Sequence, residues 1–119
     1  MSLDVDLMVM QPVSVYEANI THNLGAMARE VQFGLEWKGD GELSLYDVLW
    51  RPDEHGFVYA KDISDLLDIG WNILLSDPEK YKRYNPENGW GSYDGLVSFV
   101  YRYRNACWDN PDAELRISR

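Results

Sequence analysis

The sequence of 119 residues has one cysteine, two histidines and no long hydrophobic run. A lone Cys107 cannot form an intramolecular disulfide or supply a cysteine-rich zinc site by itself. The uncharged stretch from Leu7 to Tyr16 contains Gln11 and Pro12 and is too short and polar to span a bilayer. The opening Met-Ser-Leu-Asp-Val-Asp carries acids where a signal peptide carries bases. We therefore expect a protein of the reducing cytoplasm that has no membrane partner.

Basic residues are also few, with 11 Lys and Arg against 20 Asp and Glu, which gives a formal net charge of −9. This balance excludes general affinity for nucleic acid or anionic membranes, since both are polyanions. The hydrophobic content of 45%, with 13% aromatic residues, is enough to build a core. The length predicts a single domain covering residues 1–119.

Two terminal segments show the period-2 alternation of half-buried strands. Leu3, Val5 and Leu7 alternate with polar residues near the N-terminus, and Leu115 and Ile117 do so near the C-terminus. We expect these strands to pair in one small antiparallel sheet. Packed against three to four helices, the sheet would form an α+β fold.

Helical spacing of apolar residues predicts helices over about 22–30, 63–74 and 93–108, a shorter one over 79–84 and a single turn over 45–50. Residues 32–44 are less regular. Their short alternation and the turn signal at Lys38–Gly41 predict an irregular flap or hairpin.

A first cluster of polar side chains lies at Asn19, Thr21, His22 and Asn23, where a helix is expected to begin. Threonine is a good N-cap, and unpaired amides with a partial positive charge favour an anion or polar ligand at a helix start. Capping together with one hydrogen-bonded histidine is the alternative interpretation.

A second cluster, Asn85–Gly95, combines three glycines with Asn88, Trp90 and Tyr93. Glycine lets the backbone approach a ligand, and the aromatic rings offer stacking faces. The cluster lies in a segment, residues 80–104, whose five basic and two acidic residues give a net charge of +3. Basic side chains interleaved with aromatic ones suit a ligand with a phosphate and a nucleobase that stacks on a ring. The alternatives are a solvated helix face and a turn anchored by aromatic residues.

Catalytic motifs are lacking, since no metalloprotease, P-loop, nucleophile-elbow or Cys-x-x-Cys pattern occurs. His22 with Glu17 or Asp94 would form an acid–base pair if the fold brought them together. Cys107 lies on an apolar helix stripe, where an inert buried thiol is expected. We expect no cofactor and no bound metal.

Four stretches read together resemble a family of small bacteriophage and bacterial proteins without an established activity. They are Asn-Ile-Thr-His-Asn-Leu-Gly-Ala-Met-Ala (19–28), Leu-Trp-Arg-Pro (49–52), Asn-Pro-Glu-Asn-Gly-Trp-Gly-Ser-Tyr-Asp-Gly (85–95) and the ending Leu-Arg-Ile-Ser-Arg. The resemblance implies a phage or mobile-DNA setting, and hence the host cytoplasm. It also favours the two polar clusters as a ligand site, and we expect them to face each other across one pocket.

The leading hypothesis is a non-catalytic binder of a small anionic, nucleotide-like molecule, which in a phage would sequester a host immune signal and which would form a homo-oligomer. The first cluster would hold a polar or phosphate group, aromatic rings would stack a base, and basic side chains would neutralise charge. A small hydrolase using His22, and an acidic protein-interaction module, are the alternatives. The residues expected in the site are Asn19, Thr21, His22, Asn23, Trp50, Arg51, Lys82, Arg83, Asn88, Trp90 and Tyr93.

Overall fold

The computed structural model describes residues 2–9, 14–36 and 42–119. Over these residues the chain forms a compact α+β fold, as predicted, with one three-stranded and one two-stranded antiparallel sheet and five α-helices. The helices outnumber the three to four expected, because residues 45–50, expected to form a single turn, form the six-residue helix α2.

The larger sheet has the order β2-β1-β5, with β1 (Ser2–Met8) in the centre and antiparallel to β2 (Ser14–Thr21) and β5 (Glu114–Ser118). The predicted pairing of the terminal strands is confirmed, with Val5 opposite Ile117. The alternating apolar residues of β1 are fully buried. β2 was not predicted as a strand, because Ile20 is its one buried residue and its apolar alternation is weak.

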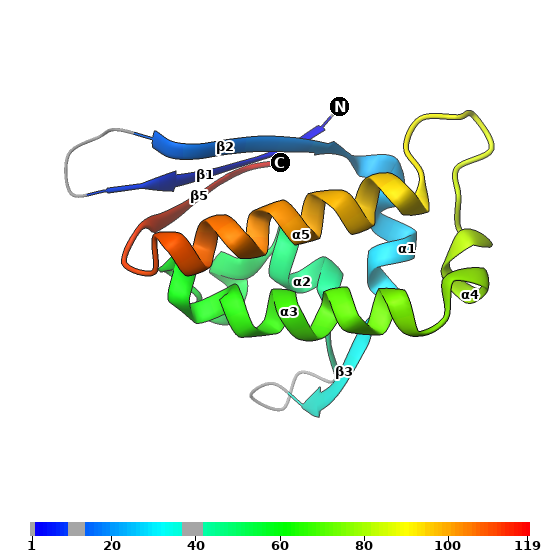
Figure 1. The fold of residues 1–119 in the computed structure, drawn as a ribbon, viewed down its shortest axis with the longest axis horizontal. Helices are drawn as coiled ribbons and strands as arrows, with labels where there is room; N and C mark the ends of the chain where they lie inside the picture. Colours follow the sequence, from blue (N-terminus) through cyan, green and yellow to red (C-terminus); the bar gives the residue numbers. More distant parts are fainter. Residues whose placement is uncertain (1, 10–13, 37–41) are drawn as a thin grey trace.

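The helical elements are η1 (His22–Leu24), α1 (Gly25–Arg29), α2 (Leu45–Trp50), η2 (Pro52–His55), α3 (Ala60–Ser76), α4 (Pro78–Lys82) and α5 (Tyr93–Asp109). α5 runs along the sheet and lies between it and α3 (Figure 1). The yellow loop before α5 reaches the end of the molecule where β2 turns into α1 (Figure 1).

Local capping explains where several helices begin. Ser92 Oγ accepts a hydrogen bond from the amide of Gly95 at 3.1 Å, and Asp77 Oδ1 accepts one from the amide of Lys80 at 3.3 Å. In α2, Ser44 and Asp47 form a reciprocal capping box. Such caps provide a hydrogen-bond partner for amides that have none within the helix, and so they favour the start of a helix at these residues.

Within residues 32–44, β3 (Gln32–Glu36) pairs with β4 (Glu42–Ser44) in the two-stranded sheet. The turn predicted at residues 38–41 lies outside the described residues. The amide of Leu45 donates to the carbonyl of Val31 at 2.8 Å, which joins the end of this small sheet to the chain that follows α1.

The buried apolar residues form one cluster, drawn from the three-stranded sheet and from the helices. Tyr103 and Phe99 on α5 are its largest fully buried side chains. Cys107 is also buried there, and desolvation raises the pKa of its thiol to about 12. Among the described residues, no helix has the length and apolar character needed to cross a membrane.

Candidate functional site

The two polar clusters meet around one cavity of about 570 Å³. We call it the amide cavity. Besides Ser2, its lining contains six of the eleven expected residues: Asn19, Thr21, His22, Asn23, Asn88 and Trp90. The predicted convergence of residues 19–23 with the loop before α5 is therefore present in the structure.

β2 and η1 position the first group of side chains. Asn19 and Thr21 are two residues apart on β2, so their side chains lie on the same face of the strand. Thr21 also caps η1, because its hydroxyl oxygen accepts a hydrogen bond from the amide of Asn23 at 3.3 Å. The helix that follows, α1, has five residues, so the side chains rather than a helix dipole define this site.

The loop before α5 is held against this junction by Gly91. Its φ is +100°, and a Cβ at this position would lie 2.7 Å from Thr21 Cγ2 and 3.0 Å from Leu24 Cγ. Within the same loop, Asn88 Oδ1 accepts a hydrogen bond from the amide of Trp90 at 2.9 Å. Glycine thus permits the close approach that places Trp90 at the cavity.

Among the described residues that line it, the amide cavity has hydrogen-bonding groups and an aromatic face but no Asp, Glu, Lys or Arg side chain. In the described part of the chain, no residue makes a hydrogen bond to the side chains of Asn19 or Asn23. Trp90 is 70% exposed. These amides can pair with the polar edge of a neutral ring, while the indole can stack on its face.

His22 forms a wall shared with a second cavity of about 280 Å³. The rings of His22 and Trp50 make an edge-to-face contact, with the centroids 6.1 Å apart. His22 Nε2 is buried, and no hydrogen-bond partner for it occurs among the residues that the structure describes. A buried polar atom without a partner lowers stability, and a group supplied by a ligand would remove that cost.

We call the second cavity the arginine cavity, because arginine side chains line it. Besides His22 its lining consists of Gly25, Arg29, Tyr46, Trp50, Arg51 and Arg119. The rings of Tyr46 and Trp50 stack with centroids 5.2 Å apart. Hydrogen bonds from Arg51 to Tyr46 and Glu54 raise the pKa of its guanidinium further, so Arg51 stays charged.

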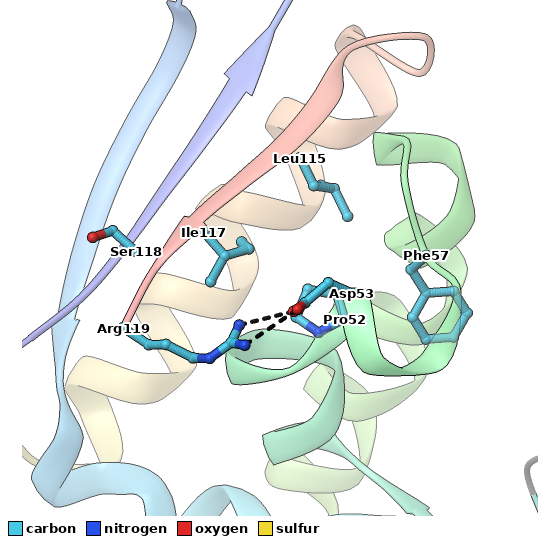
Figure 2. Close-up of a pocket in the computed structure, with 7 residues that line it drawn as sticks. All are labelled: Pro52, Asp53, Phe57, Leu115, Ile117, Ser118 and Arg119. Atoms are coloured by element: carbon cyan, nitrogen blue, oxygen red, sulfur yellow. Dashed lines mark hydrogen bonds and ion pairs between the residues drawn. The ribbon is translucent and has the colours of Figure 1, made fainter.

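Arg119 also borders a third cavity, of about 520 Å³, between β5 and η2 (Figure 2). There its guanidinium forms two hydrogen bonds with Asp53, at 2.8 and 3.2 Å, and these bonds lower the pKa of the Asp53 carboxyl. Leu115 and Ile117 of β5 make much of the remaining lining. In this third cavity the guanidinium of Arg119 is thus already paired with Asp53 and is not free for a ligand.

Three expected site residues line neither the amide cavity nor the arginine cavity. Tyr93 is buried, and its hydroxyl donates a hydrogen bond to the carbonyl of Leu74 at 2.6 Å, so it anchors α5 to α3. Lys82 and Arg83 lie exposed at the end of α4, where Lys82 faces Glu79. Trp50 does reach the arginine cavity, but it is buried and stacks on Tyr46 rather than offering a free face.

The geometry gives His22 no catalytic partner within the described ranges. No hydrogen bond or ion pair joins it to Glu17 or Asp94, and no Asp or Glu side chain is among the described residues that line the two cavities that it borders. Over the same ranges, no group of three or more His, Cys, Asp or Glu side chains comes together as a metal site would require. The arrangement is suited to holding a molecule by hydrogen bonds, stacking and positive charge.

Arg29, Tyr46 and Arg119 were not predicted as site residues. Helical periodicity could have indicated Arg29, because His22, Gly25 and Arg29 are spaced i, i+3 and i+7 and so share one helix face. Tyr46 and Trp50 are likewise four residues apart on α2. Arg119 has no such local signal, because its neighbours in the cavity are distant in sequence.

Comparison with known proteins returned no match: no family model, no curated protein and no solved structure is similar to this chain.

Proposed function

We propose that this protein binds a small nucleotide-like molecule and releases it unchanged. The amide cavity carries the proposal, because uncharged hydrogen-bonding side chains surround a cavity at which an exposed tryptophan lies. A nucleobase presents both donors and acceptors along its edge and a flat π face, which matches amides beside an indole. Asn19, Asn23 and Asn88 would read the edge, and Trp90 would stack on the face.

The phage setting implied by the motif resemblance suggests a biological role for this binding. A binder that does not turn over its ligand would sequester a nucleotide signal of host immunity. A second copy of the chain would help to enclose the ligand, because Trp90 lies 70% exposed in one copy. The hydrolase hypothesis has less support, since the described residues that line the two cavities place no Asp or Glu side chain beside His22.

Thermal unfolding with adenine and guanine nucleotides, linear and cyclic, tests the proposal. At a concentration of about 100 times Kd a bound nucleotide raises Tm by roughly 10 °C. Trp90→Ala should remove this rise while leaving the Tm of the free protein nearly unchanged. Trp108→Ala is the matched control, because Trp108 is also exposed, at 47%, but lies on the last turn of α5.

Recovery of the nucleotide after heat denaturation separates a binder from an enzyme. We expect chromatography to return the added nucleotide intact. If no nucleotide raises Tm, or if Trp108→Ala abolishes the rise as completely as Trp90→Ala, the binding proposal is wrong. A hydrolysed nucleotide would show instead that the protein is an enzyme.

A further inference from the structure

The arginine cavity concentrates positive charge in an acidic protein. Three of the seven arginines of the chain line it, and the described residues of its lining include no Asp or Glu side chain. They come from three separate segments: Arg29 from the end of α1, Arg51 from the residue after α2, and Arg119 from the residue after β5. The fold thus gathers cations that the sequence spreads over 91 positions.

Two of these guanidinium groups are already compensated. Arg51 Nη1 lies 2.9 Å from Glu54 Oε2. Arg119 forms its paired hydrogen bonds with Asp53 and lies 3.6 Å from the Glu54 carboxylate. Arg29 is thus the one of the three arginines that has no ion pair among the described residues.

Arg29 is exposed and packs on an aromatic ring. Its guanidinium carbon lies 3.9 Å from the centroid of the Tyr46 ring, and no ion pair of Arg29 is found in the part of the chain that the structure describes. Tyr46 stacks in turn on the buried Trp50, with an interplanar angle of 14°. Stacking fixes the guanidinium plane but uses none of its N–H groups, so the donors remain available to an anion.

We propose that the arginine cavity is the phosphate subsite of the ligand, with Arg29 as its principal cation. The inference rests on the proposed function for the identity of the base, which would occupy the amide cavity. The two cavities share His22 as a wall and are therefore neighbours, and the inference requires that one molecule with a neutral ring and an anionic end extends past His22 into both. The guanidinium fork matches phosphate oxygens by paired hydrogen bonds.

This assignment moves the phosphate away from the start of η1, where the polar side chains of residues 19–23 were expected to hold it. Those side chains lie in the amide cavity, whose described lining residues include no Lys or Arg. It also replaces Lys82 and Arg83 as charge-neutralising residues, since neither lines the two cavities.

Calorimetric titration with inorganic pyrophosphate tests the subsite independently of any base. Pyrophosphate should bind the wild-type protein, and Arg29→Gln should weaken that binding about tenfold or more. Arg83→Gln is the matched control, because it removes the same charge from the same residue type outside both cavities. The inference is wrong if wild type does not bind pyrophosphate or if the two variants weaken binding equally.

A comparison of AMP with adenosine, and of GMP with guanosine, then separates this inference from the proposed function. We expect the monophosphate to bind about tenfold more tightly than its nucleoside, and Arg29→Gln to remove that advantage while leaving nucleoside affinity unchanged. Equal affinity for nucleotide and nucleoside would overturn the phosphate subsite but not the binding of the base. Absence of binding by all four, with pyrophosphate still bound through Arg29, would overturn the proposed function alone.

Discussion

Cys107 and Tyr103 show how burial decides what a single reactive group can do. Both lie fully buried on α5, and desolvation raises the pKa of the Cys107 thiol to about 12 and that of the Tyr103 phenol well above its ordinary value. A thiol with such a pKa is not ionised near neutrality, and the thiolate is the nucleophilic form. Cys107 therefore belongs to the core rather than to any chemistry.

Burial of the Cys107 thiol makes stability depend on alkaline pH. In the unfolded chain the thiol ionises near its reference pKa of 9.0, whereas in the folded protein it ionises near 12. Folding thus favours the neutral thiol. The contribution of the buried Cys107 side chain to the free energy of unfolding is therefore complete below pH 9 and is lost as pH rises from 9 towards 12. The loss can reach about 1.4 kcal/mol per pH unit.

Urea unfolding of wild type and Cys107→Ala near pH 8 and near pH 10.5 measures this effect. The alanine variant loses packing at both pH values, but its free energy of unfolding should fall less between them. Tyr103 is present in both proteins and cancels in the comparison. Identical pH dependence of the two proteins would show that the thiol titrates normally.

At the scale of elements, the contact between the loop before α5 and the β2–η1 junction builds the amide cavity. Gly91 makes this contact with a backbone conformation that side chains rarely adopt, and it faces Thr21 and Leu24 at distances that leave no room for a Cβ. Gly89 also has a positive φ, of 75°, but nothing lies within 4 Å of its would-be Cβ.

Substitution of these two glycines should separate strain from contact. Gly89→Ala adds backbone strain alone and should lower the free energy of unfolding by about 1 kcal/mol. Gly91→Ala adds overlap with Thr21 and Leu24 and should cost roughly 2–3 kcal/mol, with weaker nucleotide binding as Trp90 moves. Chemical denaturation measures both, and equal losses would mean that the loop does not depend on this contact.

Elements whose signals are local could be predicted from the sequence. Ser92 and Asp77 indicate where α5 and α4 begin, because a capping side chain accepts a hydrogen bond from an amide only three residues further along the chain. The terminal strands show clear alternation, whereas β2 does not, because its residues are mostly half-buried or exposed. Its position depends on pairing with β1, which residue patterns alone do not encode.

At the scale of the whole molecule, the gathering of charge could not be predicted from runs of sequence. The basic and aromatic segment 80–104 suggested an anion site, yet Arg104 is buried against Asp68 at 2.9 Å and stacks on three aromatic rings. The arginine cavity takes its cations from other segments instead. Convergence of distant residues is a property of the tertiary fold.

The candidate site was predicted in the same uneven way. Residues 19–23 and Asn88 with Trp90 could be found because each group is contiguous and rich in polar or aromatic side chains. Arg29 is marked only by the helical spacing that it shares with His22 and Gly25, and Arg119 could not be placed because its neighbours in the arginine cavity are distant in sequence. The net charge of −9 still disfavours long polyanions, while one arginine-lined cavity is compatible with a small one.

The most direct test of nucleotide binding across the two cavities is an NMR titration of ¹⁵N-labelled protein with the nucleotide that raises Tm most. We predict that side-chain signals of Asn19, Asn23, Trp90 and Arg29 shift together and saturate with one Kd. The signals of Trp108 and Arg83 should remain unchanged. Shifts confined to Trp108 and Arg83, or no shift at Trp90 and Arg29 at saturation, would contradict this account.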